Sequence, residues 1–451
     1  MKGLRMVWGT VAWGIMVLSV PAWGQEGAPP PEEVLTLERA VALALENDRP
    51  LKNAGLEVGK AADRIAAART RRLPALQVGV TESMLVLPIE LQFRRGDFGT
   101  YPVIGPIPAE DTTLRTPRKL TTSVSARVAQ PLSQLYRLTL GIDQLGVSQN
   151  IAQEDLRFQR QTTIRDVKST YYGVLQVQSA LEAVEETITF YRELDRVVGE
   201  QVAQQAALKA DSLEVRARLA KAEYEAFSAQ NELASRKEQL NDLLGRDVET
   251  AFRVSPVPEA TGVKADLTEA RAQAVSRRPE IRRAELQVEQ AEYDRRMKAA
   301  EYIPDLNLVF AYLSPVTSDR LPKNIGYVGL ELSWEFYDWG RKRQEIAERL
   351  RTIDQAKNAL EGTRSQVVLD VKRRLRKLRE AEELLKVTEM SREAAREKAR
   401  ITMNQYRQQA VLLKDLLEAQ AGLAHANDQY QQALLGFWTA KADFEKALGE
   451  D

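Results

Sequence analysis

The chain has 451 residues, and its 64 Lys and Arg residues balance 64 Asp and Glu residues, so no basic excess favours a nucleic-acid partner. Cysteine is absent and histidine occurs once, at His425, which excludes thiol catalysis and Cys/His zinc sites, and we expect no bound metal. With 28% charged and only 6% aromatic residues, the composition is typical of long amphipathic helices, and we expect no enzyme, no catalytic residue and no cofactor.

The first residues have the pattern of an export signal. Two basic residues precede an apolar run from Val7 to Val20, and the small residues of Ala22–Gly24 supply a cleavage site before Gln25. Residues 1–24 are therefore predicted to be a signal peptide. An uncleaved membrane anchor is the alternative interpretation of the same apolar run. Residues 25–34 follow as a leader.

One structural unit occurs twice in the sequence. The apolar pattern of Leu51–Val58 recurs in Ile281–Val288. We call the difference in residue number between these two segments the long offset. The pattern of Asp211–Gly245 recurs in Asp415–Gly449. The difference in residue number is smaller here, and we call it the short offset. The two offsets differ because the first copy contains an enlarged Pro/Gly-rich loop, Pro88–Pro117, to which the sequence assigns no role. The resulting organisation is a first repeat at 35–250, a linker at 251–264 and a second repeat at 265–451.

Each repeat changes its hydrophobic period along the chain. Apolar residues three and four apart predict a helix over Leu37–Arg72. Alternation then predicts a β-hairpin in each repeat, and the clearest strand is Tyr327–Phe336. The other strands begin at Leu76 or cover Thr121–Val128 and Leu306–Tyr312.

A very long helix follows each hairpin. The predicted long helices, Arg137–Lys209 and Arg341–Leu412, contain no proline and are about 72 residues long, or about 108 Å. A shorter helix then returns along each of them, at Ser212–Leu244 and Asp415–Leu448. We expect the short helices on either side of the hairpin to stack end to end beside the long helix.

Two architectures fit this pattern. In the first, the strands belong to a membrane β-barrel that several chains share, because four strands cannot close a barrel. Aromatic residues near the strand ends favour this interpretation. In the second, the strands form a soluble cap on a periplasmic coiled-coil stalk without a channel. The residues of the clearest strand that would face lipid in the first are Val328, Leu330, Leu332 and Trp334.

Several segments of the chain resemble the TolC-type outer-membrane factors, which form the outer membrane efflux protein family. The resemblance extends over essentially the whole chain after the signal. The segments that carry it are Leu35–Asn47, Tyr302–Leu306, Leu332–Arg341 and Tyr406–Gln420.

The resemblance implies a fold, a location and partners. The fold is mainly α with a small β part: a homotrimer whose long coiled-coil helices form an α-barrel in the periplasm. Four strands from each chain join in a shared 12-stranded transmembrane β-barrel in the outer membrane. Such a protein is the passive exit duct of a tripartite efflux pump or a type I secretion system. It works with a periplasmic adaptor protein and an inner-membrane pump.

The resemblance also implies a gate at the periplasmic tip. Acidic rings around the axis would be formed by Asp415 and Glu418, and Tyr406 would take part in the links that hold the closed state. The residues also have a structural interpretation, because Asp415 opens a helix and Glu418 follows three residues later, as in helix capping. Asp211 and Glu214 repeat this arrangement in the first repeat.

Three positions at the tip depart from the family pattern. Gln409, and Gln205 in the first repeat, stand where the family usually has a glycine. Val411 stands where the best-studied member carries a gate arginine. The two glutamines leave open how the hairpin tips turn and which periplasmic adaptor they fit. Because of Val411, we expect the closed state to be held differently in this chain.

Overall fold

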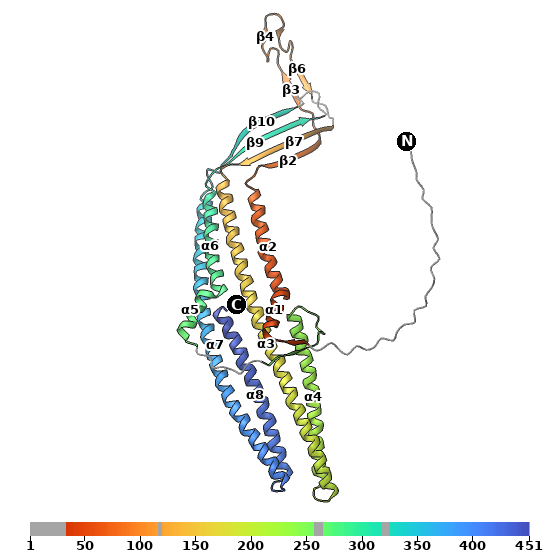
Figure 1. Cartoon of the computed structure of the whole chain (residues 1–451). Helices are drawn as coiled ribbons and strands as arrows, with labels where there is room; N and C mark the ends of the chain where they lie inside the picture. Colours follow the sequence, from red (N-terminus) through yellow and green to blue (C-terminus); the bar gives the residue numbers. More distant parts are fainter. Residues whose placement is uncertain (1–32, 116–119, 257–264, 317–323, 451) are drawn as a thin grey trace, which may run out of the picture.

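The structure, a computed structural model, describes residues 33–115, 120–256, 265–316 and 324–450. The predicted signal peptide, most of the leader and most of the linker lie outside the described residues. Figure 1 shows a long helical rod with a β-sheet at one end. Among the described residues, none of the helices combines the length and the apolar character needed to cross a membrane.

The helices of the two repeats correspond one to one. In the first repeat they are α1 (Leu37–Asn47), α2 (Arg49–Thr70), α3 (Leu135–Ala203) and α4 (Lys209–Leu243). In the second repeat they are α5 (Leu267–Arg277), α6 (Pro279–Ala300), α7 (Arg341–Arg407) and α8 (Leu413–Leu448). The lengths of the two long helices, 69 and 67 residues, are close to the predicted length.

The single helix predicted over Leu37–Arg72 is wrong, because the chain breaks between α1 and α2 at Asp48. The Asp48 carboxylate caps α2 by accepting a hydrogen bond from the backbone N–H of Leu51 at 3.2 Å. The equivalent break in the second repeat lies at Arg278, which is followed by Pro279. Proline is favoured at the first positions of a helix, where its missing N–H costs no hydrogen bond.

The predicted end-to-end stacking of the short helices is confirmed. Gly245 ends α4 with a left-handed φ of 64° and lies against the end of α1, so that a Cβ there would stand 2.7 Å from the backbone oxygen of Asn47. Gly449 ends α8 in the same way against Arg277 at the end of α5. Only glycine fits such a close approach without strain.

The four long strands form one antiparallel sheet in the order β10-β9-β7-β2. Their bounds are Ala75–Met84 (β2), Leu120–Pro131 (β7), Asp305–Pro315 (β9) and Ile325–Ser333 (β10). Ala75 is opposite Ala129 in the first hairpin, and Asp305 is opposite Ser333 in the second. Asp305 is the equivalent of Ala75 at the long offset, and Ser333 is the equivalent of Ala129 at the short offset. The two hairpins therefore share one register.

The predicted strand Tyr327–Phe336 ends earlier than expected. β10 stops at Ser333, and Trp334 therefore lies beyond the strand to which it was assigned. Ser333 pairs with Asp305, the first residue of β9, and Pro304 precedes it. Because proline has no N–H to donate, the ladder ends at this pair.

The long loop of the first repeat contains an arm of residues 89–115. β3 (Glu90–Phe93) pairs with β6 (Thr112–Arg115), and β4 (Thr100–Tyr101) pairs with β5 (Gly105–Pro106) near the end of the arm. Figure 1 shows that the arm extends from the end of the sheet that lies away from the helices.

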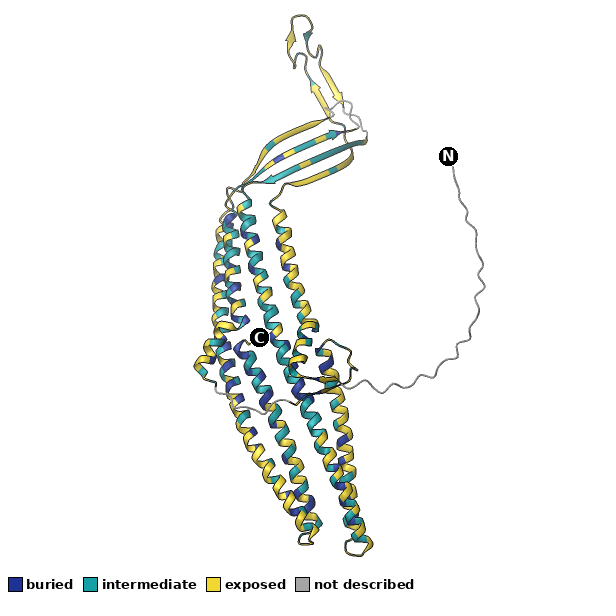
Figure 2. Ribbon diagram, viewed as in Figure 1, coloured by how far each residue is buried: buried dark blue, intermediate teal, exposed yellow. Residues whose placement is uncertain are grey.

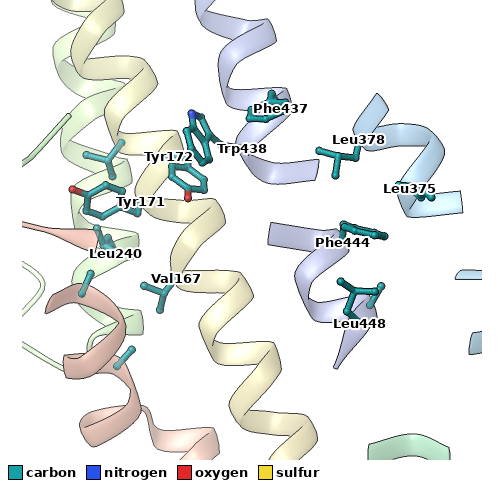
Figure 3. Close-up of a cluster of buried hydrophobic side chains, with 14 of the residues drawn as sticks. Val167, Tyr171, Tyr172, Leu240, Leu375, Leu378, Phe437, Trp438, Phe444 and Leu448 are labelled. Atoms are coloured by element: carbon teal, nitrogen blue, oxygen red, sulfur yellow. The ribbon is translucent and has the colours of Figure 1, made fainter. Parts of the chain in front are cut away.

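The core of the rod lies near its middle, where the helix ends of both repeats meet (Figure 2). Two short parallel strands, β1 (Glu33–Leu35) and β8 (Phe252–Val254), join the start of the first repeat to its end. Buried Tyr171 of α3 holds them, because its hydroxyl lies 2.9 Å from the carbonyl oxygens of Leu35 and Ser255. Tyr172 packs beside it against Trp438 of α8, with ring centroids 5.6 Å apart (Figure 3).

Candidate functional site

One face of the sheet is apolar across all four strands. Leu76 of β2 is opposite Val128 of β7, which is opposite Phe310 of β9, which is opposite Val328 of β10. Three side chains of this row are exposed, with 78% of the accessible surface remaining for Leu76, 45% for Phe310 and 69% for Val328, and Val128 is partly buried. Leu330 and Leu332 lie on the same face of β10 as Val328 and are also exposed.

The opposite face of the sheet carries most of the polar side chains, although β9 places Val309, Ala311 and Leu313 there. Gln77 is opposite Arg127, and Arg127 forms an ion pair with Glu331 of β10. An apolar face and a polar face on the same strands are typical of a sheet that separates lipid from water.

The sheet and the helical layer have matching open edges. Within the described residues, β2 and β10 each pair with one strand only, on opposite sides of the sheet. In the helical layer, α3 packs against α2 and α4 on one side and against α6 and α8 on the other, and α7 lies beyond these two helices (Figure 1). Both outer helices expose large apolar side chains. Examples are Tyr224 and Phe227 on α4 and Leu369, Val387 and Met390 on α7.

The hairpin turns at the far end of the rod carry two glutamines with unusual backbone angles. Gln205 has a φ of 62° and Gln409 has a φ of 58°. Both residues are therefore left-handed, a conformation that costs an L-residue free energy and that glycine adopts freely. The tip turns as it would with glycine, in spite of the departure from the family pattern.

Asp415 and its equivalent Asp211 are helix caps at the tip. The Asp415 carboxylate accepts a hydrogen bond from the backbone N–H of Leu412 at 3.1 Å, and Asp211 accepts one from Leu208 at 3.0 Å. The capping interpretation of Glu418 is wrong, because Asp415 occupies the capping-box position. Glu418 lies one turn further along α8, and its carboxylate is 3.6 Å from the ammonium group of Lys414.

Tyr406 links the two repeats near the tip. Its hydroxyl donates a hydrogen bond to the side-chain oxygen of Gln201 in α3, at 3.2 Å. Burial raises the pKa of Tyr406 above its usual value, and the negative charge of Asp211 raises it further. Gln201 was not predicted from the sequence, because its role depends on where the end of α7 lies relative to the end of α3. Within the described ranges, no group of three or more His, Cys, Asp and Glu side chains forms a candidate metal site.

A family model described as "Outer membrane efflux protein" matches residues 40–246 and 270–450, which include most of both repeats. The chain belongs to the outer membrane efflux protein family. It is 23% identical over 306 residues to the alkaline protease secretion protein AprF of Pseudomonas aeruginosa. The matches to the curated relatives cover less than two thirds of their length, 64% and 63%.

Solved outer-membrane channels share the fold of this efflux-family chain. The transmembrane channel CusC matches with a TM-score of 0.74 and 16% identity, over 96% of this chain and 99% of that chain. The Campylobacter jejuni outer membrane channel CmeC also gives a TM-score of 0.74, with 15% identity, over 92% of this chain and 85% of that chain. At sequence identities this low, the similarity to these channels shows a shared fold.

Proposed function

We propose that the chain is a passive exit duct in the outer membrane, formed by three identical copies. Four strands from each copy build a 12-stranded transmembrane β-barrel, and the helices continue it as a tunnel in the periplasm. The two tandem repeats, the signal peptide at residues 1–24 and the linker near residues 251–264 belong to this proposal. The duct catalyses no reaction and needs no cofactor.

The observation that supports the proposal most directly is the apolar row on the sheet. Leu76, Phe310 and Val328 of this row keep much of their side-chain surface accessible in the described chain, and lipid would remove this surface from water. Four strands cannot close a barrel, whose smallest members have about eight strands. The open edges at β2 and β10 would be joined between copies, which leaves no exposed strand edge in the membrane.

The partners follow from the lack of an energy source. The sequence contains no nucleotide-binding loop of the Walker type, so a passive duct needs an energised inner-membrane pump and a periplasmic adaptor. Membership of an efflux family and similarity to a relative named for protease secretion both support an export role. Either a tripartite efflux pump or a type I secretion system agrees with this reasoning.

We assign the gate of the duct to the helical tip. Asp415 and Glu418 would form acidic rings around the axis, because three copies bring six carboxylates to a narrow mouth and focus a negative field. Tyr406 would hold the closed state through its bond to Gln201. Opening would then require the second-repeat helices to move away from α3.

Membrane fractionation of cells that express the full chain tests the proposal. We expect the protein in the outer membrane, as a trimer that migrates as one species in mild detergent and dissociates on heating. Purified protein should form channels in planar bilayers. A soluble protein without channel activity would contradict the proposal and favour the alternative, a periplasmic structural coiled-coil protein.

A further inference from the structure

The two repeats make equivalent contacts. Ala75 pairs with Ala129 in the first hairpin, and Asp305 pairs with Ser333 in the second. Asp305 is the equivalent of Ala75 at the long offset, and Ser333 is the equivalent of Ala129 at the short offset. The helix ends at the middle of the rod meet in pairs that are related by the same two offsets. A contact made by one repeat can therefore be translated into the equivalent contact of the other.

The interface between the repeats of one chain is a template for the interface between copies. Inside the chain, α3 of the first repeat packs against α6 and α8 of the second, and β7 pairs with β9. The equivalent elements on the outer edges are α7 and β10 on one side and α2, α4 and β2 on the other (Figure 1). In a closed ring of identical copies, these two edges meet.

We infer from this template that β10 of one copy pairs antiparallel with β2 of the next copy, with Gly329 opposite Ser83. Within the chain the equivalent pair is Ser125 of β7 opposite Leu313 of β9. Gly329 is the equivalent of Ser125 at the short offset. Ser83 in the first repeat is the equivalent of Leu313 in the second repeat at the long offset. The inference rests on the proposed function, since it requires copies arranged in a ring.

The same template brings Glu348 of one copy beside Arg64 of the next. Their equivalents within the chain are Gln144 of α3 and Asp294 of α6, which are joined by a hydrogen bond of 2.6 Å between their side chains. At the outer edges these positions hold opposite charges, and both side chains are exposed. In the described part of its own chain, neither Arg64 nor Glu348 forms an ion pair. In the inferred assembly, an ion pair between neighbouring copies gives Arg64 and Glu348 a partner of opposite charge.

Cysteine cross-linking tests the strand register, because the chain contains no cysteine of its own. The full-length variant Gly329→Cys with Ser83→Cys should form disulfides between copies and give covalent dimers and trimers on a non-reducing denaturing gel. Residues directly opposite each other in antiparallel strands are about 5 Å apart, within reach of a disulfide. Nothing lies within 4 Å of a Cβ built at Gly329, so the substitution has room.

Two matched variants control this experiment. Ser125→Cys with Leu313→Cys reproduces the template pair and should form a disulfide within one chain. Gly329→Cys with Gln77→Cys lies far out of register, about 20 Å along the strand, and should not cross-link. If Gly329→Cys links better to Thr81→Cys than to Ser83→Cys in an assembly that is still trimeric, the register is wrong but the proposed function stands. Monomeric protein that gives no cross-link between copies at any position overturns both.

A charge exchange tests the helical contact independently. Arg64→Glu should lower the temperature at which the trimer dissociates, because two carboxylates would then face each other. Adding Glu348→Arg should restore most of the loss. If the double variant is no more stable than Arg64→Glu alone, these two residues are not neighbours in the assembly.

Discussion

The hydroxyl of Tyr406 in α7 donates a hydrogen bond to the side chain of Gln201 in α3, and this bond joins the two long helices near the tip of the rod. Burial raises the pKa of Tyr406 above its ordinary value near 10, so the hydroxyl remains a donor at any physiological pH. The link therefore does not act as a pH switch. If the tip is the gate, this bond stabilises its closed form.

Removing the hydroxyl should open the tip more often. We expect Tyr406→Phe to weaken the link by about 1 kcal/mol, which corresponds to roughly a fivefold change in a closed-to-open equilibrium. Single-channel recording in planar bilayers would measure the increase in open time. Tyr136→Phe is the matched control, because Tyr136 is exposed at the start of α3, far from the tip. Equal behaviour of the two variants would exclude Tyr406 from the gate.

The acidic residues of the two repeats should differ in function although they are alike in structure. Asp415→Ala with Glu418→Ala should lower cation selectivity and abolish block by trivalent cations, because it removes the focused negative field. Asp211→Ala with Glu214→Ala should affect stability more than selectivity. Reversal potentials in planar bilayers under a salt gradient distinguish these outcomes. Unchanged selectivity and block in the first variant would contradict the acidic rings and leave Asp415 only a helix cap and Glu418 only a partner of Lys414.

The apolar face of β10 predicts an asymmetric response to charge. Leu330→Arg should cost about 2–4 kcal/mol if the side chain lies near the bilayer midplane, and it should reduce the amount of trimer in the outer membrane. Ser333→Arg introduces the same charge on the polar face and should be tolerated. Quantitative immunoblots of membrane fractions would compare them. Equal damage from both variants would contradict the membrane-barrel proposal.

Most of the fold was predictable because it follows from periodicity and duplication. The lengths of the long helices depend on local apolar spacing, and the caps Asp211 and Asp415 are short-range features that the sequence displays. The break at Asp48 was missed because the segments on both sides of it have the apolar spacing of a helix. Pro50, at the second position of α2, was the local signal for this boundary.

The features that could not be predicted are those that depend on distant segments. The end of β10 at Ser333 is decided by Pro304 on the neighbouring strand, and the partner of Tyr406 comes from the other repeat. Neither relation leaves a trace in the local pattern of residues. The sequence also did not indicate which helices lie at the outer edges of the helical layer, because exposed apolar residues at an edge have the same spacing as buried apolar residues in the core.

The left-handed glutamines of the tip should be replaceable by glycine with a gain in stability. Gln409 has a φ of 58°, and glycine at this position relieves a backbone strain of about 1 kcal/mol, although the more flexible unfolded chain offsets part of the gain. We expect Gln409→Gly to slow hydrogen exchange at the ends of α7 and α8. Gln408→Gly is the control, because Gln408 has an ordinary φ of −89° and glycine should destabilise the turn there. Faster exchange in both variants would show that strain at Gln409 is not significant.

The middle of the rod contains a buried charge network centred on Asp370 of α7. Its carboxylate accepts hydrogen bonds from Arg278 at 3.0 Å, Arg373 at 2.8 Å and Arg374 at 3.0 Å. Only 10% of the Arg278 side chain and 17% of the Asp370 side chain are exposed. Burial alone would raise the pKa of Asp370, but the hydrogen bonds from Arg373 and Arg278 and the charge of Arg374 outweigh it and hold the pKa below its ordinary value.

This lowered pKa predicts a specific loss of stability in acid. A carboxyl group with a folded pKa below its unfolded value stabilises the fold above the unfolded value of about 4, and this contribution disappears as the pH falls through the folded pKa. We expect Asp370→Asn to cost about 2 kcal/mol at pH 7, because it weakens charge-assisted hydrogen bonds in a largely buried site, although Arg278 keeps Glu280 and Arg374 keeps Asp443 as counter-charges. The variant should also lose less stability than the unchanged protein between pH 5 and pH 3.

The duplication supplies the control for this last prediction. Asp166 of α3 is the equivalent of Asp370 at the short offset and pairs with Arg165 at 2.7 Å, but 37% of its side chain is exposed. Ion pairs in contact with solvent contribute little, so Asp166→Asn should change the stability by less than about 1 kcal/mol. Melting temperatures of the purified assembly in detergent, recorded from pH 7 to pH 3, compare the two variants. A similar, small effect of both substitutions would mean that the Asp370 network stabilises the middle of the rod no more than a surface ion pair does.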